Sequence, residues 1–300
     1  MLEPLALFHR KALRGILSLG KFSTTPALHF LLGELPIEGK IHRDIFSLFY
    51  SIWRNPDSKI YSIIRYLLDT TQNNSRTWAA HLRYLCTKYN IPDPLESLKK
   101  DPPSKEEFKE YILTKISAFF ETDMRDKAKN SSSMRYLNVS LTGLRGKKHP
   151  ALSGIVTTHE VKKAKIHMKM LAGDYLTYEV RANRSGGSPH CRNCPEKTLK
   201  NENLRHILTE CNSYRTTRER IFPEFSKACQ LTKSKLCFED ILKSDQELTQ
   251  FILDPASLNL QKRVHMSDPA IDELFRISRD YCYTINTIRM HQHSEQQKSD

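Results

Sequence analysis

The sequence lacks several features that would assign it to common classes of protein. It has no apolar run of about 18 residues or more, so it offers no candidate membrane-spanning helix. Only 10 glycines and 14 prolines occur among 300 residues, which excludes collagen-like and low-complexity chains. The seven cysteines are an odd and mostly scattered set, which does not fit a disulfide framework. A reducing compartment is therefore expected.

The N-terminal stretch also lacks the order of a secretory signal. Its cations lie inside an apolar segment rather than ahead of one. We interpret this stretch as an amphipathic helix rather than as an Arg-rich mitochondrial presequence. Together with the cysteine usage, this predicts a protein of the nucleus or cytoplasm that is not secreted.

Acidic residues are too few to balance the basic ones. The chain has 47 Lys and Arg against 34 Asp and Glu, a net charge of +13. Such a surplus favours a polyanionic partner. Residues 143–220 carry 16 cations and 7 anions, whereas residues 221–300 carry 10 cations and 12 anions. A surplus concentrated in one part of the chain indicates a binding face rather than a generic surface.

Apolar residues recur mainly at helical spacing. Ser104 and Glu107 form a capping-box pattern at the start of one such segment. Strand candidates are limited to 136–144 and 174–180, and neither alternates cleanly. We therefore predict a mainly α fold, a multi-helix array. The segments expected to be helical are 4–18, 40–53, 57–69, 75–88, 104–124, 154–172 and 268–290.

A group of Cys and His residues in 191–211 has the spacing of a metal site. Cys191 and Cys194 are separated by two residues, His206 follows after eleven more, and Cys211 after a further four. Three thiolates and one imidazole are a ligand set of structural zinc sites. On a straight α-helix, positions 206 and 211 would lie about 140° apart, so we expect the helix to end before Cys211. The sequence thus predicts a small zinc-knuckle insertion in the helical array, with zinc as the cofactor.

Other side chains are weaker ligand candidates. His190 is adjacent to Cys191, and neighbouring residues rarely both reach one tetrahedral centre. A redox role for the Cys-x-x-Cys pair would require a βαβ context, which the pattern lacks. The thiols outside the cluster are expected to be small buried hydrophobic side chains, namely Cys86, Cys229, Cys237 and Cys282.

The surroundings of these ligands resemble a known family. The Cys-x-x-Cys pair, a polar spacer, the residues HILTEC, Tyr214 and an Arg-rich stretch resemble the zinc knuckle downstream of the reverse transcriptase in non-LTR retrotransposons. Residues 171–175 resemble the glycine segment before that knuckle, and residues 32–36 resemble the helix–Pro–helix step after the polymerase palm and thumb. The resemblance spans most of residues 5–225 and implies the C-terminal portion of a retroelement protein.

The catalytic features of a polymerase are missing from the sequence. A reverse transcriptase holds two metal ions with paired carboxylates, but the chain has no Asp-Asp pair and only the lone Asp69 after a helix. Fingers and palm have no room before Phe8, and the motifs GxSxG, HExxH, GxGxxG and the P-loop are absent. We therefore expect no enzymatic activity and a truncated or fragmentary copy of an RNA-directed DNA polymerase. A nuclease built from scattered Asp and Glu is the catalytic alternative.

Two groups of basic residues are candidates for nucleic-acid binding. On a helix, Lys162, Lys165 and Lys169 fall near one face and could follow a phosphate backbone, while Tyr175 and Tyr178 could stack on bases. The first group comprises Arg145, Lys147, Lys148, Lys162, Lys163, Lys165 and Lys169. The second group surrounds the knuckle and comprises Arg192, Lys197, Lys200, Arg205, Arg215, Arg218 and Arg220.

These patterns predict an organisation and a function. We expect a non-catalytic zinc-binding protein that binds RNA or single-stranded DNA, with a retroelement template as the partner, and that does not bind a membrane. The alternative is a zinc-stabilised structural or protein-interaction module without nucleic-acid binding. The expected regions are a helical region at 1–100 resembling the segment after the palm and thumb, a basic helical linker region at 101–185, the zinc knuckle at 186–225, a C-terminal helical region at 226–290 and a polar tail at 291–300.

Overall fold

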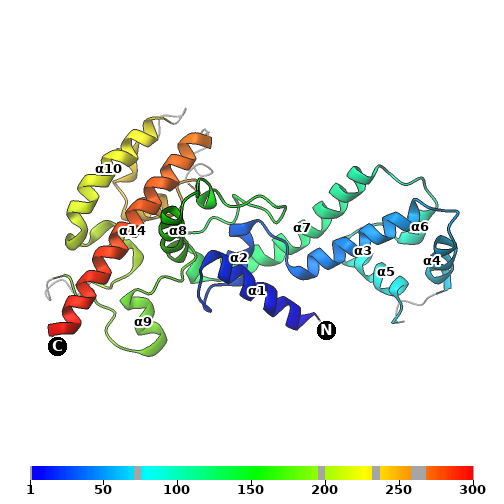
Figure 1. Ribbon diagram of the computed structural model, residues 1–300, viewed down its shortest axis with the longest axis horizontal. Helices are drawn as coiled ribbons and strands as arrows, with labels where there is room; N and C mark the ends of the chain where they lie inside the picture. The colour runs from blue at the N-terminus through cyan, green and yellow to red at the C-terminus, as the bar shows by residue number, and fades with distance from the viewer. Residues whose placement is uncertain (1, 71–75, 195–199, 232–236, 258–267, 300) are drawn as a thin grey trace. The chain divides into compact units, whose positions relative to one another are not determined.

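A computed structural model shows a mainly α-helical chain, which confirms the predicted fold class (Figure 1). The structure describes residues 2–70, 76–194, 200–231, 237–257 and 268–299. Within these ranges there is no β-strand, and an isolated antiparallel bridge joins His190 to Asn201. Among the same residues, no helix is long and apolar enough to cross a bilayer.

The chain divides into two compact units, each discontinuous in sequence. The first unit comprises residues 1–11, 33–127 and 143–147. The second unit comprises residues 12–32, 128–142 and 148–300. The regions expected from the sequence follow chain order instead, and the zinc-knuckle and C-terminal regions both fall within the second unit.

The first unit packs its helices around aromatic side chains. Tyr50 stacks on Phe108 with ring centroids 4.7 Å apart, and Trp53 lies edge-on to both rings. The backbone N–H of Ser104 donates to Glu107 Oε2 (3.0 Å), and that of Glu107 donates to Ser104 Oγ (3.3 Å), which confirms the predicted capping box. The helices are α3 (Ile37–Trp53), α4 (Lys59–Thr70), α5 (Trp78–Tyr89), α6 (Pro94–Leu98), the first part of α1 (Glu3–Leu17) and most of α7 (Lys105–Lys129).

The second unit is organised by a long C-terminal helix, α14 (Asp268–Ser299), which packs against α8 (Thr158–Leu171) and α10 (Arg215–Gln230) (Figure 1). Phe225, Phe251, Phe275 and Tyr281 are fully buried members of one continuous hydrophobic core. The α-helices of the unit besides α14 are α2 (Thr25–Leu32), α8 (Thr158–Leu171), α9 (Tyr178–Ser185), α10 (Arg215–Gln230), α11 (Phe238–Ile241) and α12 (Asp245–Leu253). Single helical turns lie at η1 (Ser132–Met134), η2 (Pro150–Leu152), η4 (His206–Glu210) and η5 (Asn212–Tyr214).

One local interpretation of the sequence is wrong, and one helix is longer than predicted. The strand candidate 136–144 forms irregular turns, and the candidate 174–180 forms the loop leading into α9 and the first turn of that helix. Their backbone groups find other partners than a sheet ladder, as when the N–H of Asn138 donates to Asp254 Oδ2 (3.1 Å). The polar tail is helical, since α14 continues through Ser299. Residues 291–299 contain no Gly or Pro and are rich in Gln, Glu and Lys, which favour a helix.

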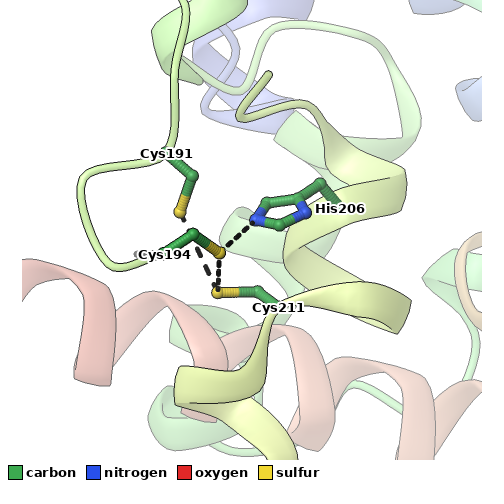
Figure 2. A group of neighbouring side chains, drawn as sticks. All are labelled: Cys191, Cys194, His206 and Cys211. Atoms are coloured by element: carbon green, nitrogen blue, oxygen red, sulfur yellow. Dashed lines mark hydrogen bonds between the residues drawn. The ribbon is translucent and has the colours of Figure 1, made fainter. Parts of the chain in front are cut away.

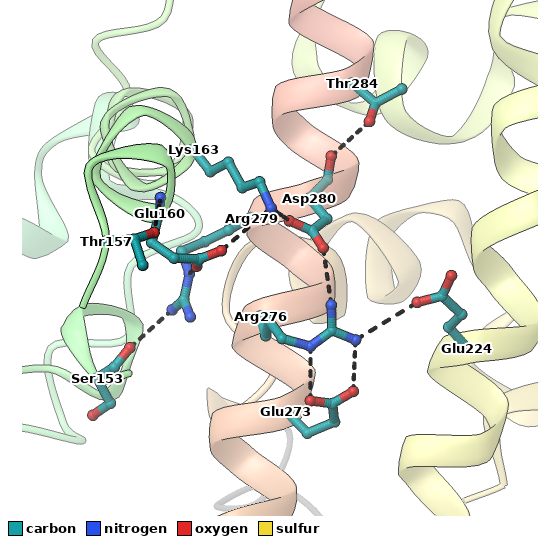
Figure 3. A network of polar contacts seen from close by, with 10 residues as sticks. All are labelled: Ser153, Thr157, Glu160, Lys163, Glu224, Glu273, Arg276, Arg279, Asp280 and Thr284. Atoms are coloured by element: carbon teal, nitrogen blue, oxygen red, sulfur yellow. Dashed lines mark hydrogen bonds and ion pairs between the residues drawn. The ribbon is translucent and has the colours of Figure 1, made fainter. Parts of the chain in front are cut away.

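A polar network joins α8 to α14 inside the second unit (Figure 3). Lys163 Nζ lies 2.5 Å from Asp280 Oδ1 and 3.3 Å from Glu160 Oε1, and Arg276 binds the other oxygen of Asp280 at 2.9 Å. Burial alone would lower the pKa of Lys163, but hydrogen bonds to Asp280 and Glu160 outweigh burial and raise it. Lys163 thus stabilises the contact of two helices and does not belong to a solvent-facing basic surface.

Replacement of Lys163 by Met should therefore destabilise the protein. The change leaves the half-buried carboxylates of Asp280 and Glu160 without their shared cation, and we expect the free energy of unfolding to fall by about 1–2 kcal/mol. Lys165 lies two residues further along α8 and is exposed, so Lys165→Met is the matched control and should change stability by less than about 0.5 kcal/mol. Denaturant unfolding followed by circular dichroism measures both. Equal losses in the two variants would contradict the structural role of Lys163.

Candidate metal centre

A short hairpin positions the first two ligands of the cluster. The backbone N–H of Cys191 donates to Lys200 O (2.9 Å), and that of Glu202 donates to Pro189 O (2.8 Å). The N–H of Cys194 then donates to Cys191 O (3.4 Å) and closes a turn. This turn brings both sulfur atoms to the same side of the chain (Figure 2).

A π-helical turn positions the other two ligands. The N–H of Cys211 donates to His206 O at 2.8 Å, a bond between positions five apart. Such a bond brings these positions together, whereas a straight α-helix would keep them about 140° apart. Cys211 itself has extended backbone angles. The prediction that the α-helix ends before Cys211 is confirmed, and the physical reason is the π turn.

The four ligand atoms converge on one point (Figure 2). All lie within 4.8 Å of one another. Cys211 Sγ is 3.9 Å from the sulfur atoms of both Cys191 and Cys194, and Cys194 Sγ is 3.3 Å from His206 Nε2. Metal–sulfur bonds of about 2.3 Å and a metal–nitrogen bond of about 2.0 Å in a tetrahedron would separate the sulfurs by about 3.8 Å and sulfur from nitrogen by about 3.5 Å. These residues could hold a metal ion, and their spacing fits a tetrahedral one.

The protonation of the thiols also fits a cation site. A hydrogen bond with Cys191 lowers the pKa of Cys211 to about 4, against the effect of burial and with the help of His206. The same hydrogen bond, followed by burial, raises the pKa of Cys191, and burial raises the pKa of Cys194. The protein's own groups therefore favour one thiolate among the three. A bound divalent cation would favour ionisation of the other two.

Glu210 supports the histidine ligand. Its Oε2 lies 3.5 Å from His206 Nδ1, the ring nitrogen that faces away from the thiols. Arg205 and Lys200 hold the same carboxylate at 2.9 and 3.0 Å. A carboxylate at the second nitrogen fixes the tautomer and orientation of a metal-binding imidazole. Sequence reasoning missed this role, although the spacing of four residues on a helical turn could have indicated it.

The metal cluster is tied to the core of the second unit. The hydroxyl of Tyr281 donates to Leu208 O at 2.5 Å, and Arg218 Nη2 donates to Cys211 O at 2.7 Å. Glu202 is buried and lies 2.6 Å from Arg289 Nη2 of α14. The hairpin and the π turn are therefore fastened to α10 and α14, not only to each other.

Some of the predicted basic residues are paired with acidic or carbonyl groups, and others are exposed without an ion pair. Arg145 is paired with Glu110, Arg215 is paired with Glu219, and Arg218 binds a carbonyl of the metal loop. Lys200 and Arg205 share Glu210, as described above. Arg145 and Lys147 belong to the first unit, whereas Lys148 belongs to the second. Lys197 lies outside the described residues. The exposed predicted cations with no ion pair within the part of the chain that the structure describes are Lys147, Lys148, Lys162, Lys165, Arg192 and Arg220; Lys169 is half-buried.

The structure also tests the expectations for two tyrosines, for the cysteines outside the cluster and for His190. Tyr175 and Tyr178 are buried and lie against the guanidinium of Arg289, so they cannot serve as open stacking platforms for bases. Cys237 is exposed rather than buried, because it begins the short helix α11 at the surface. Cys86, Cys229 and Cys282 are buried, as predicted. The metal cluster found among the described residues does not include His190.

No family model, no curated protein and no solved structure matches the chain.

Loss of one ligand should abolish metal retention. We expect one metal ion per wild-type chain in native mass spectrometry under reducing conditions, and a large loss of occupancy in Cys194→Ser and His206→Ala. Cys237→Ser removes a thiol outside the cluster and serves as the control, which should retain the ion. A wild-type chain without bound metal would refute the site.

Glu210 should tune metal affinity without being a ligand. Glu210→Gln removes the charge beside His206 Nδ1, and we expect the affinity measured by competition with a chelator to fall about tenfold or more. Glu219→Gln is the control, because Glu219 is exposed and pairs with Arg215. If Glu210→Gln and Glu219→Gln bound the metal equally well, the orienting role of Glu210 would be excluded.

Proposed function

We propose that the chain is a non-catalytic nucleic-acid-binding protein whose second unit is held together by a structural zinc ion. Zinc is the metal that a tetrahedral set of three thiolates and one imidazole favours. All four positions are filled by the chain's own residues, and a closed ligand set is typical of structural rather than catalytic zinc. The convergence of the four ligand atoms supports this part of the proposal.

The nucleic-acid part of the proposal is supported by the positive charge of the second unit. The second unit has 28 Lys and Arg against 19 Asp and Glu, a net charge of +9. Lys162, Lys165 and Lys169 lie at three- and four-residue steps on α8 and share one face of that helix. None of the three forms an ion pair within the described residues. A row of unpaired cations is the feature that a phosphate backbone requires.

The retroelement origin belongs to the same proposal. It rests on the order and spacing of the knuckle ligands, the arginines after them and the helix–Pro–helix step near the N-terminus. The coding DNA upstream of Met1 tests it. A reading frame continuous with a polymerase palm that carries an Asp-Asp turn would support it, and an unrelated upstream sequence would argue against it.

The salt dependence of binding tests the nucleic-acid part. We expect the logarithm of the binding constant for single-stranded DNA or RNA to fall linearly with the logarithm of salt concentration. The triple variant Lys162→Gln, Lys165→Gln, Lys169→Gln should reduce that slope by about 2, because each phosphate contact on a single strand contributes about 0.7.

The control for this experiment removes the same charge elsewhere. Lys99, Lys127 and Lys243 are exposed and already paired with carboxylates of a neighbouring turn. Their triple Gln variant should keep a slope close to that of the wild type. A wild-type slope near zero, or equal slopes in the two triple variants, would favour the alternative of a zinc-stabilised interaction module.

A further inference from the structure

A pocket of about 450 Å³ lies beside α9 in the second unit. Its walls come from three segments that are distant in sequence: the η1 turn with the residues after it, α9 with the loop before it, and the residues just ahead of His206. The volume falls within the range of pockets for small ligands. Neither the four metal ligands nor the cations of α8 line this pocket.

The pocket is rich in hydrogen-bond donors. Arg135 and Arg184 line it and are exposed, and neither forms an ion pair within the described residues. The amides of Asn183 and Asn203 are also in its wall. Two unpaired guanidinium groups favour an anion such as a phosphate group, which arginine binds through a planar fork.

An exposed aromatic ring adjoins this pocket through Arg184. The guanidinium of Arg184 lies over the ring of Phe22 at 4.1 Å from its centroid, and Lys21 Nζ is 5.0 Å from the same centroid. Phe22 is 56 % exposed. A guanidinium–phenyl pair with a second cation is a surface on which a nucleobase can stack. Arg184 therefore belongs both to this stack and to the wall of the pocket.

One acidic residue narrows the choice of ligand. Glu179 lies in the wall, and its Oε1 accepts from Asn201 Nδ2 at 3.4 Å. A carboxylate accepts hydrogen bonds from the exocyclic amino group of a base. It also repels phosphate groups, so it disfavours a ligand that carries several of them. The pocket thus offers donors for one phosphate, amides and a carboxylate for the edge of a base, and a surface for stacking. This combination matches a nucleotide better than an inorganic polyphosphate.

We infer that this pocket binds one nucleotide of a single-stranded nucleic acid, with its base stacked at Arg184 and Phe22 and its phosphate at Arg135 or Arg184. The inference rests on the proposed function and assigns it a specific site. It also replaces the buried Tyr175 and Tyr178 by an exposed aromatic residue as the stacking platform. Nucleotides on either side would lie on the cationic surface of the same unit.

Fluorescence anisotropy with labelled single-stranded DNA and RNA of about ten nucleotides tests this site. Phe22→Ala and Arg184→Gln should each weaken binding about fivefold or more, because each removes part of the stack. Leu231→Ala and Arg54→Gln are matched controls, since Leu231 is 68 % exposed and Arg54 is exposed and belongs to neither predicted basic group. They should weaken binding by less than about twofold.

A second readout covers the case in which a variant fails to fold. Ultraviolet cross-linking of the wild-type complex, followed by mass spectrometry, should identify peptides containing Phe22, Tyr136 or residues 175–184. Cross-links confined to other peptides, or equal affinities of the pocket variants and their controls, would overturn the nucleotide site while leaving the proposed function intact. A wild-type chain that binds neither oligonucleotide would overturn both.

Discussion

The buried pair of Glu202 and Arg289 is the interaction on which the arrangement of the second unit depends. Glu202 is 1 % exposed and Arg289 is 5 % exposed, so both charged groups are largely desolvated. Glu202 Oε1 accepts from Arg289 Nη2 (2.6 Å) and from the N–H of Tyr178 (2.9 Å), and Arg289 also donates to Leu176 O (3.1 Å). A buried pair adds little net stability, but removal of one partner is costly. The pair therefore fixes one arrangement of α9, α14 and the hairpin that carries Cys191 and Cys194.

The Cys/His cluster and this pair together order residues 189–194 and 200–211. The segment has few large apolar side chains, so hydrophobic burial alone cannot offset its conformational entropy. Ligand convergence fixes the hairpin relative to the π turn, and Glu202 fixes the hairpin relative to α14. The bond from Tyr281 to Leu208 O adds a third tie. A bound metal would stabilise the whole unit because these ties carry its effect beyond the knuckle.

The sequence predicted what depends on local spacing. The helices with regular apolar stripes, the capping box at Ser104 and the ligand set were predictable because each is encoded within a few turns of chain. The helices that were missed are α2, α6, α9, α10, α11 and α12. The interior Pro223 of α10 obscured its pattern, and α2 is buried on all sides, so it has no polar face to reveal its period.

Features that depend on long-range pairing could not be predicted. Nothing near Glu202 in sequence points to Arg289, and the pocket combines residues from three separated segments. The same limit applies to charge. Lys163 and Lys165 are equivalent in a count of cations, yet only the contact of α8 with α14 shows that Lys163 is bound by Asp280 and Glu160. Net charge therefore identifies a basic region, and ion pairing decides which of its cations are available to a ligand.

These constraints connect the metal cluster to the pocket beside α9. The N–H of Glu179 donates to Glu202 O (3.2 Å), and the N–H of Tyr178 donates to the side chain of Glu202, so the first turn of α9 is held by the metal hairpin. On the other wall, Asn203 Oδ1 accepts from the N–H of His206 (2.9 Å), which joins the pocket to a metal ligand through the backbone. A structural ion in this position would set the spacing of the two walls without contacting the ligand. Zinc binding and nucleotide binding would then be coupled through the position of one helix.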